Sequence, residues 1–183
     1  MKITFYKGLL LLFLLSACSS DQEQVQKGPK SPFQTTQPSV LYFKNMRSVN
    51  YKQRRQEPKM DVYTFRQFTD TDSRPILYPL IVNNWLQDEA YLLIERNEFG
   101  AFADSLIVQW ESPTDSSGTF YLANTFKQQQ YEFGLALYQR LKEDCSLKIK
   151  SSDGTYVPLF DQKEDRFHYA TVVRDFLRLT EAL

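Results

Sequence analysis

The spacing of the apolar residues changes near residue 124, and this change constrains the fold more than any other feature of the sequence. Before that point, apolar and aromatic residues gather in short runs separated by Pro, Asn, Asp or Gly, a pattern typical of β-strands. After it, they recur at steps of three and four residues, as in amphipathic helices. Helices with one apolar face need a sheet or each other to cover it, so we expect an α+β domain with a mainly antiparallel sheet.

The sequence predicts about seven to eight short strands. In chain order, the runs are residues 40–43, 61–68, 76–82, 90–95, 105–111, 119–122, 146–150 and 155–160. Pro75 and Pro79 would fit poorly in a central strand, so we expect run 76–82 at a sheet edge or with a bulge. The turn residues 113–118 and the pair Asp153-Gly154 each join two runs, which predicts two hairpins.

Two amphipathic helices are expected in the last third of the chain. Asn124 would cap the first, which would end near Asp144 and bury Phe126, Phe133, Leu137 and Leu141, with Gln130 as the one interruption. The second would open at residues 161–164, which have the spacing of a capping box. Its predicted buried stripe is Tyr169, Val172, Val173, Phe176, Leu179 and Leu183, with Thr171, Arg174, Asp175, Arg178 and Glu181 on the opposite face.

The chain divides into three parts by composition. Residues 1–17 have the layout of a secretory signal peptide: Lys2 and Lys7, then an apolar run, then small residues. The uncharged stretch 8–20 is shorter than the roughly 20 residues that a membrane-spanning helix needs. Residues 18–39 are polar, which predicts a disordered tether. We expect residues 40–183 to form a single domain.

The four residues Leu15-Ser16-Ala17-Cys18 resemble the lipobox of bacterial lipoproteins. The resemblance implies that Cys18 carries a lipid on its sulfur and becomes the acylated first residue of the mature protein. Ser19 occupies the place where that family has Asp when a protein stays in the inner membrane. The resemblance therefore implies the outer membrane of a Gram-negative bacterium, on either its periplasmic or its surface face. The alternative is an ordinary signal peptide with a cysteine near its cleavage point.

A basic stretch follows the expected tether. The chain has 22 Lys+Arg and 22 Asp+Glu, so its overall charge gives no attraction to nucleic acid. The stretch itself contains Lys44, Arg47, Lys52, Arg54, Arg55 and Lys59. Behind a signal peptide, its anionic partners would be lipid or lipopolysaccharide phosphates, or an acidic protein surface. The alternative is a solvated strand and loop.

The residues that often carry catalysis or bind metals form no convergent set. His168 is the single histidine, and the nucleophile motif G-x-S-x-G is absent. The acidic cluster Asp70-Thr71-Asp72 does not continue into a calcium-binding loop, and Asp88-Glu89 is only a pair. Beside a lipidated Cys18, Cys145 has no cysteine of the same chain to pair with; we expect it to be buried, the alternative being a pairing with another molecule. We therefore predict no metal, no cofactor and no enzymatic activity.

An aromatic and polar group follows the third run. Tyr78, Asn83, Asn84, Trp85 and Asp88 combine flat rings with amide and carboxylate groups, a mixture that binds sugars. The same residues also occur where a strand ends in a turn below a tryptophan. The sequence as a whole favours a non-enzymatic outer-membrane lipoprotein that binds or scaffolds another envelope component. The alternative is a carbohydrate-active or glycan-binding envelope protein.

Overall fold

The folded unit begins earlier than the composition predicts. The computed structural model describes residues 31–183 apart from 58, 69–72, 98, 100–104 and 124–125, and it describes Gln56 and Glu57 by their backbone alone. The chain separates into Met1–Lys30 and a compact unit, Ser31–Leu183. Within the predicted tether, Phe33 and Thr35 are buried. The predicted boundary at Val40 is therefore too late, because Phe33 supplies a core side chain from an otherwise polar segment.

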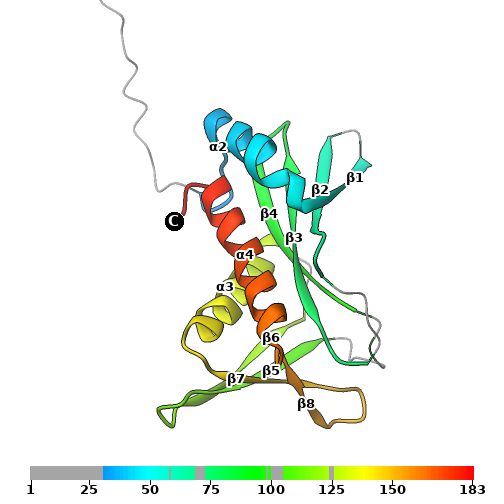
Figure 1. Cartoon of the computed structure of the whole chain (residues 1–183), viewed down its shortest axis with the longest axis vertical. Helices are drawn as coiled ribbons and strands as arrows, with labels where there is room; N and C mark the ends of the chain where they lie inside the picture. The colour runs from blue at the N-terminus through cyan, green and yellow to red at the C-terminus, as the bar shows by residue number, and fades with distance from the viewer. Residues whose placement is uncertain (1–30, 58, 69–72, 98, 100–104, 124–125) are drawn as a thin grey trace, which may run out of the picture. The chain divides into compact units, whose positions relative to one another are not determined.

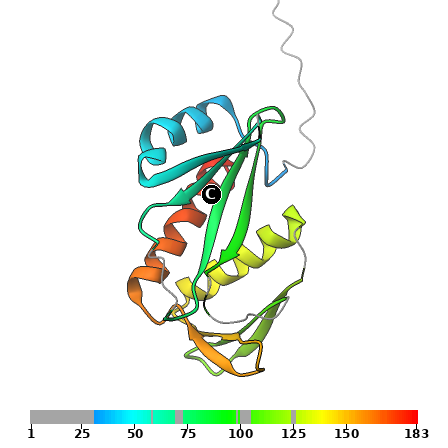
Figure 2. The same cartoon turned by 90° about the vertical axis from the view of Figure 1, so that its right-hand side faces the viewer.

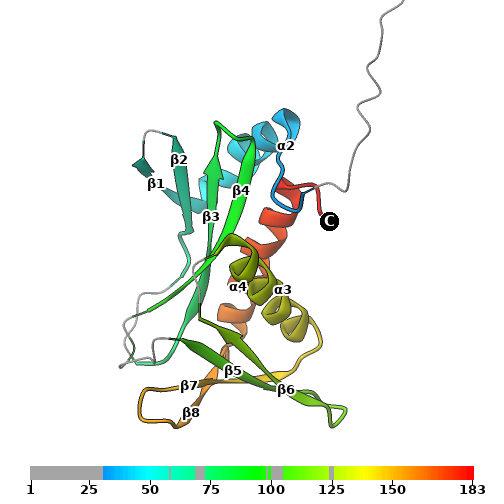
Figure 3. The same cartoon turned by 180° about the vertical axis from the view of Figure 1, so that it is seen from behind.

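Two antiparallel sheets of four strands each form the unit (Figures 1 and 3). The first has the order β1-β2-β3-β4, with bounds Tyr51–Glu57, Met60–Phe65, Leu77–Asn84 and Glu89–Arg96. The second has the order β6-β5-β7-β8; its strands are β5 (Leu106–Glu111), β6 (Ser117–Leu122), β7 (Ser146–Lys150) and β8 (Tyr156–Leu159). Both predicted hairpins are confirmed, β5 with β6 and β7 with β8.

Helices cover one side of the first sheet. They are α2 (Gln37–Tyr42), the π-helix η2 (Phe43–Arg47), the 3₁₀-helix η3 (Ser48–Asn50), α3 (Lys127–Lys142) and α4 (Lys163–Leu179). α4 packs on β3 and β4, and α3 packs on β4, β6 and α4 (Figure 2). One buried cluster runs through both sheets and both long helices. The α+β class is thus confirmed.

Residues 40–43 form helical structure, and the prediction of a strand there is wrong. Thr36 and Ser39 form a reciprocal capping box, and a proline lies in the first turn of α2. These two features start a helix before the aromatic run begins. The helical segment 37–50 therefore leads into β1, which composition did not predict because β1 is rich in charged residues.

The predicted edge position of run 76–82 is also wrong, because β3 lies between β2 and β4. The pairing of β2 with β3 ends at Leu80, so Pro79 lies just beyond it. Pro79 faces Ile94 of β4, whose amide donates to the side chain of Gln130 at 2.8 Å. The missing amide of Pro79 therefore costs no ladder hydrogen bond.

The final helix has a wider buried face than the predicted stripe. It begins at Lys163 with Gln162 as N-cap and no side-chain cap bond, so the predicted capping box does not form. Leu183 is exposed, whereas Thr171 and Asp175, predicted on the solvent face, are buried. In the first long helix Phe126 is exposed, and the predicted cap Asn124 lies outside the described residues.

Gln130, the interruption in the apolar stripe of α3, is a structural residue. Its buried side chain accepts the Ile94 amide of the edge strand β4. We expect Gln130→Ala to lower the free energy of unfolding by about 2 kcal/mol, because the buried amide loses its acceptor. Urea unfolding measures this, with the exposed Gln128→Ala as the matched control. A Gln130 variant as stable as the Gln128 variant would contradict the assignment.

Candidate functional site

The turn between β3 and β4 and the helix α2 meet at one end of the first sheet (Figures 1 and 2). The amide of Thr35 donates to the Asp88 carbonyl at 2.7 Å, and the amide of Ala90 donates to the Phe33 carbonyl at 2.8 Å. These two bonds fix the entering chain against the start of β4. Helix α2 begins directly afterwards, so its position over the turn is set by backbone hydrogen bonds.

Asn84 shapes the turn. Its side-chain oxygen accepts the Leu86 amide at 3.3 Å, its amide group donates to Gln87 at 2.8 Å, and Asp88 adopts the left-handed conformation with φ of 50°. Asparagine and aspartate tolerate such positions because their side chains bond locally. Trp85 and Leu86 consequently project outward, and 46% of Trp85 is exposed.

A groove of about 600 Å³ lies between this turn and α2, and we refer to it as the Trp85 groove. Its lining residues are Thr35, Gln37, Pro38, Val40, Leu41, Lys44, Asn83, Trp85 and Asp88. Apolar surface dominates this lining, which also includes one cation, Lys44, and one carboxylate, Asp88. Such a composition suits the binding of a ligand or of a partner side chain.

One residue that lines the Trp85 groove carries an unsatisfied polar atom. The Oδ1 atom of Asn83 is buried and has no hydrogen-bond partner among the residues that the structure describes. Buried polar atoms in folded proteins are normally paired, so an orphaned acceptor at a groove favours a ligand that donates to it. Asp61 lies opposite Asn83 on β2. Its Oδ1 lies 3.6 Å from the Arg55 guanidinium, which is an ion pair and not a hydrogen bond.

The structure separates the five residues of the predicted aromatic and polar group. Asn83, Trp85 and Asp88 line the Trp85 groove together. Asn84 is bonded within the turn. Tyr78 lines a different pocket of about 170 Å³. Tyr78 lies near the start of β3, whereas Trp85 follows the end of that strand, so the two side chains belong to opposite ends of β3.

The basic stretch is divided as well. Arg47 donates to the two carboxylate oxygens of Asp175 at 2.8 and 3.0 Å, so its charge is paired within the fold. Lys52, Arg54 and Arg55 lie exposed on the edge strand β1. The predicted contact with an anion therefore rests on these three residues, of which Arg55 also forms the ion pair with Asp61.

No pattern in the sequence predicted the ionic cluster beneath η2, which consists of Arg47, Tyr51 and Asp175. Asp175 also accepts the Tyr51 hydroxyl at 2.7 Å, inside the core. Burial and the Asp175 carboxylate raise the pKa of Tyr51 far above its usual value, and the hydrogen bond to Asp175 raises the pKa of Arg47. Both groups thus keep their protons. The cluster holds the helical segment against α4 and shows no reactive group.

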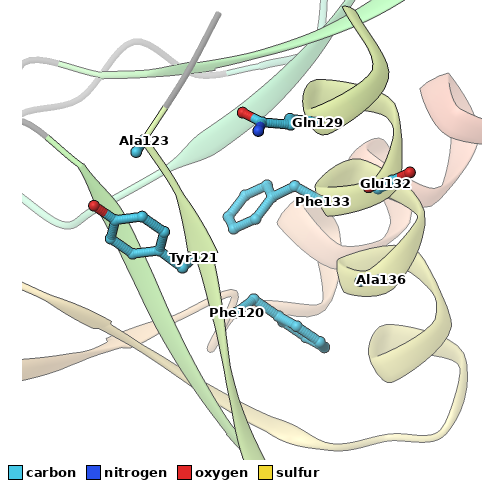
Figure 4. Close-up of a pocket in the computed structure, with 7 residues that line it drawn as sticks. All are labelled: Phe120, Tyr121, Ala123, Gln129, Glu132, Phe133 and Ala136. Carbon is cyan, nitrogen blue, oxygen red and sulfur yellow. The ribbon is translucent and has the colours of Figure 1, made fainter. Parts of the chain in front are cut away.

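A second pocket of about 500 Å³ lies between β6 and α3. Figure 4 shows Phe120 and Phe133 pointing into the space between the strand and the helix. Glu132 is the one carboxylate that lines it, and neither a histidine nor a cysteine does. The other titratable side chain in its lining is the exposed Tyr121.

The catalytic candidates do not converge in the described part of the chain. His168 lies among the rings of Phe65, Phe68 and Phe167, and burial lowers its pKa against the pull of Asp165 and Glu164. Cys145 is buried, as predicted. The described residues contain no group of three or more His, Cys, Asp or Glu side chains placed to hold a metal ion.

The two predicted acidic clusters have different outcomes. Asp70-Thr71-Asp72 lies outside the described residues. In the pair Asp88-Glu89, Asp88 lines the groove, whereas Glu89 accepts from Lys127 at 2.8 Å and from Tyr91 at 2.7 Å. The hydrogen bond from Lys127 lowers the pKa of Glu89. The carboxylates of Asp88 and Glu89 therefore lie in different environments and do not act as a pair.

Comparison with protein-family models found no match for this chain, and comparisons with curated proteins and with solved structures found no significant similarity. Within the part of the chain that is described, no helix has the length and apolar character needed to cross a bilayer.

Proposed function

We propose that this chain is a lipoprotein of the outer membrane of a Gram-negative bacterium that binds another envelope component in the Trp85 groove, without catalysing a reaction. The observation that carries the binding role is the groove itself, where Asn83, Trp85 and Asp88 meet α2. The lipobox-like residues 15–18 support the anchor. The predicted lipidation at Cys18 lies outside the described residues.

Trp85 should dominate the binding energy. A large aromatic side chain at a groove is the residue type that most often anchors an interface. We expect the protein purified from detergent with its native anchor to retain a stoichiometric partner, and Trp85→Ala to weaken the association at least about tenfold. Quantitative mass spectrometry of the purified samples measures this.

Leu86→Ala is the matched control for Trp85→Ala. Leu86 is the next residue of the same turn and is equally exposed, but it does not line the groove. The Leu86 variant should retain the partner as the parent protein does. Purification of the parent protein as a clean monomer would contradict the proposed function, and equal losses in the two variants would contradict the placement of the site.

A glycan is the second candidate occupant. The half-exposed Trp85 ring lies beside an amide and a carboxylate, groups that together stack on and hydrogen-bond to sugars. A glycan array compares the parent protein with the Trp85→Ala variant. Glycan binding that disappears in the variant would identify the envelope component as a sugar, and identical signals from the two proteins would exclude that occupant.

A further inference from the structure

The helical segment 37–50 has two apolar faces. On the inner face, Phe43 is buried against Tyr51 and Tyr63, with ring centroids 5.4 and 5.0 Å away. Arg47, four residues after Phe43, is paired with Asp175 on the same side. A surface helix normally has one apolar face, which packs on the core, and a polar face toward water. This segment departs from that pattern.

The outer face is apolar and exposed. It contains Tyr42, Met46 and Val49, which are between 47% and 71% exposed. Tyr42, Met46 and Val49 follow one another at steps of four and three residues, so they share one side of the segment. Single exposed apolar side chains are ordinary, but several on one face mark a surface that contacts another phase or molecule. We refer to these three residues as the outer apolar face.

The chain enters the folded unit at the same end of the first sheet. Gln34 forms a bridge with Glu89 at the start of β4, next to the turn that carries Trp85 and Leu86. The segment 18–31 spans at most about 45 Å when fully extended. If Cys18 is lipidated, as the proposed function requires, this end of the fold stays within about 45 Å of the lipid headgroups.

Basic residues lie at the same end of the first sheet as the outer apolar face, with Arg54 on the sheet face of Val62 and Val82 and not on the face that the helices cover. Lys44 is an exposed residue of η2. Across the three strands β1, β2 and β3, Arg54 aligns with Val62 and Val82. Arg55 aligns with Asp61 and Asn83. Both arginines therefore lie toward the end of the sheet that carries Trp85. Aromatic and aliphatic side chains beside Lys and Arg are the composition of protein surfaces that lie in the membrane interface, where the lipid is anionic.

We propose that the outer apolar face lies in the headgroup region of the bilayer that holds the Cys18 anchor, and this inference rests on the lipidation in the proposed function. The partner is a phospholipid surface and not a second protein. The anchor gives attachment, and the outer apolar face gives orientation. It fixes which end of the body faces the lipid, so the β7–β8 hairpin at the opposite end points away (Figures 1 and 3).

Spin labels on the full-length processed protein test this orientation. Met46→Cys places a nitroxide on the outer apolar face, and Asp153→Cys places one in the β7–β8 turn as the matched control. The buried Cys145 does not compete for the label. In vesicles of phosphatidylethanolamine and phosphatidylglycerol, we expect the label at 46 to collide with oxygen several-fold more than with the water-soluble complex nickel ethylenediaminediacetate. The label at 153 should show the reverse preference.

The mass of the mature protein in the same sample separates the two proposals. An acylated protein whose label at 46 is as accessible to nickel as the label at 153 would overturn the membrane-facing surface and leave the proposed anchor intact. A protein without acyl mass would overturn the anchor and this inference together. Protection of position 46 only after addition of an envelope protein extract would also overturn the inference, because a protein would then cover the face.

Discussion

Asp175→Ala should lower the free energy of unfolding by about 3 kcal/mol. The carboxylate accepts two hydrogen bonds from Arg47 and one from the Tyr51 hydroxyl. Its removal leaves the Tyr51 hydroxyl without its partner in the core and the guanidinium without its counter-charge. This loss of stability lies at the low end of the range for removing one partner of a buried ion pair, because the Arg47 side chain is 27% exposed and can reach water.

Two control variants distinguish the ionic cluster from general damage to α4. Arg178→Ala removes an exposed charge from the same helix and should change stability by less than about 0.5 kcal/mol. Tyr51→Phe removes one hydrogen bond and should cost about 1 kcal/mol. Urea unfolding of the three variants gives these values. If Asp175→Ala were no more harmful than Arg178→Ala, the ionic cluster would not hold the helical segment to α4.

Local patterns predicted most of the fold. The change of apolar period separated strands from helices, and the turn chemistry at Asp153-Gly154 placed a hairpin correctly, with Gly154 at φ of 88°. Such features depend on residues close in the chain, and local propensities act at that range. The prediction that failed most clearly, a strand at 40–43, failed because a capping box and a proline start a helix just before it.

The features that the local sequence patterns did not predict depend on contacts between residues far apart in the chain. The helical spacing assigned Asp175 to the solvent face because a carboxylate is normally solvated. Its partner Arg47 lies 128 positions earlier, so no local window contains both. Gln130 was similarly noted only as an interruption, because its partner, the Ile94 amide, belongs to a strand far away in the chain.

The candidate site was predictable in part. Asn83, Trp85 and Asp88 flank one turn, so their sequence proximity became spatial proximity in the Trp85 groove. Tyr78 belongs to the same strand, but the extended backbone carries it to another pocket. Lys44 was noted only for its charge, because its place in the groove depends on a helical segment that the composition did not predict.

Cys18→Ser should abolish membrane attachment while the folded unit stays intact. A serine hydroxyl lacks the nucleophilic thiolate that lipidation at this position requires. Each buried methylene of an acyl chain contributes about 0.8 kcal/mol, so one chain binds marginally and two or more bind firmly. We therefore expect the fraction in the detergent phase, after temperature-induced phase separation, to fall at least about tenfold. The protein should then appear in the soluble fraction or keep its signal segment.

Cys145→Ala provides the matched control, since the chain contains 2 cysteines and Cys145 is the other one. Its thiol is buried behind β7, where acyl-transfer enzymes have no access, so this variant should partition with the detergent and incorporate labelled fatty acid as the parent does. A Cys18→Ser protein that is processed to its mature form and still enters the detergent phase would contradict the anchor. The membrane orientation of the outer apolar face would then lose its basis, whereas the Trp85 groove would remain a candidate binding site of a secreted protein.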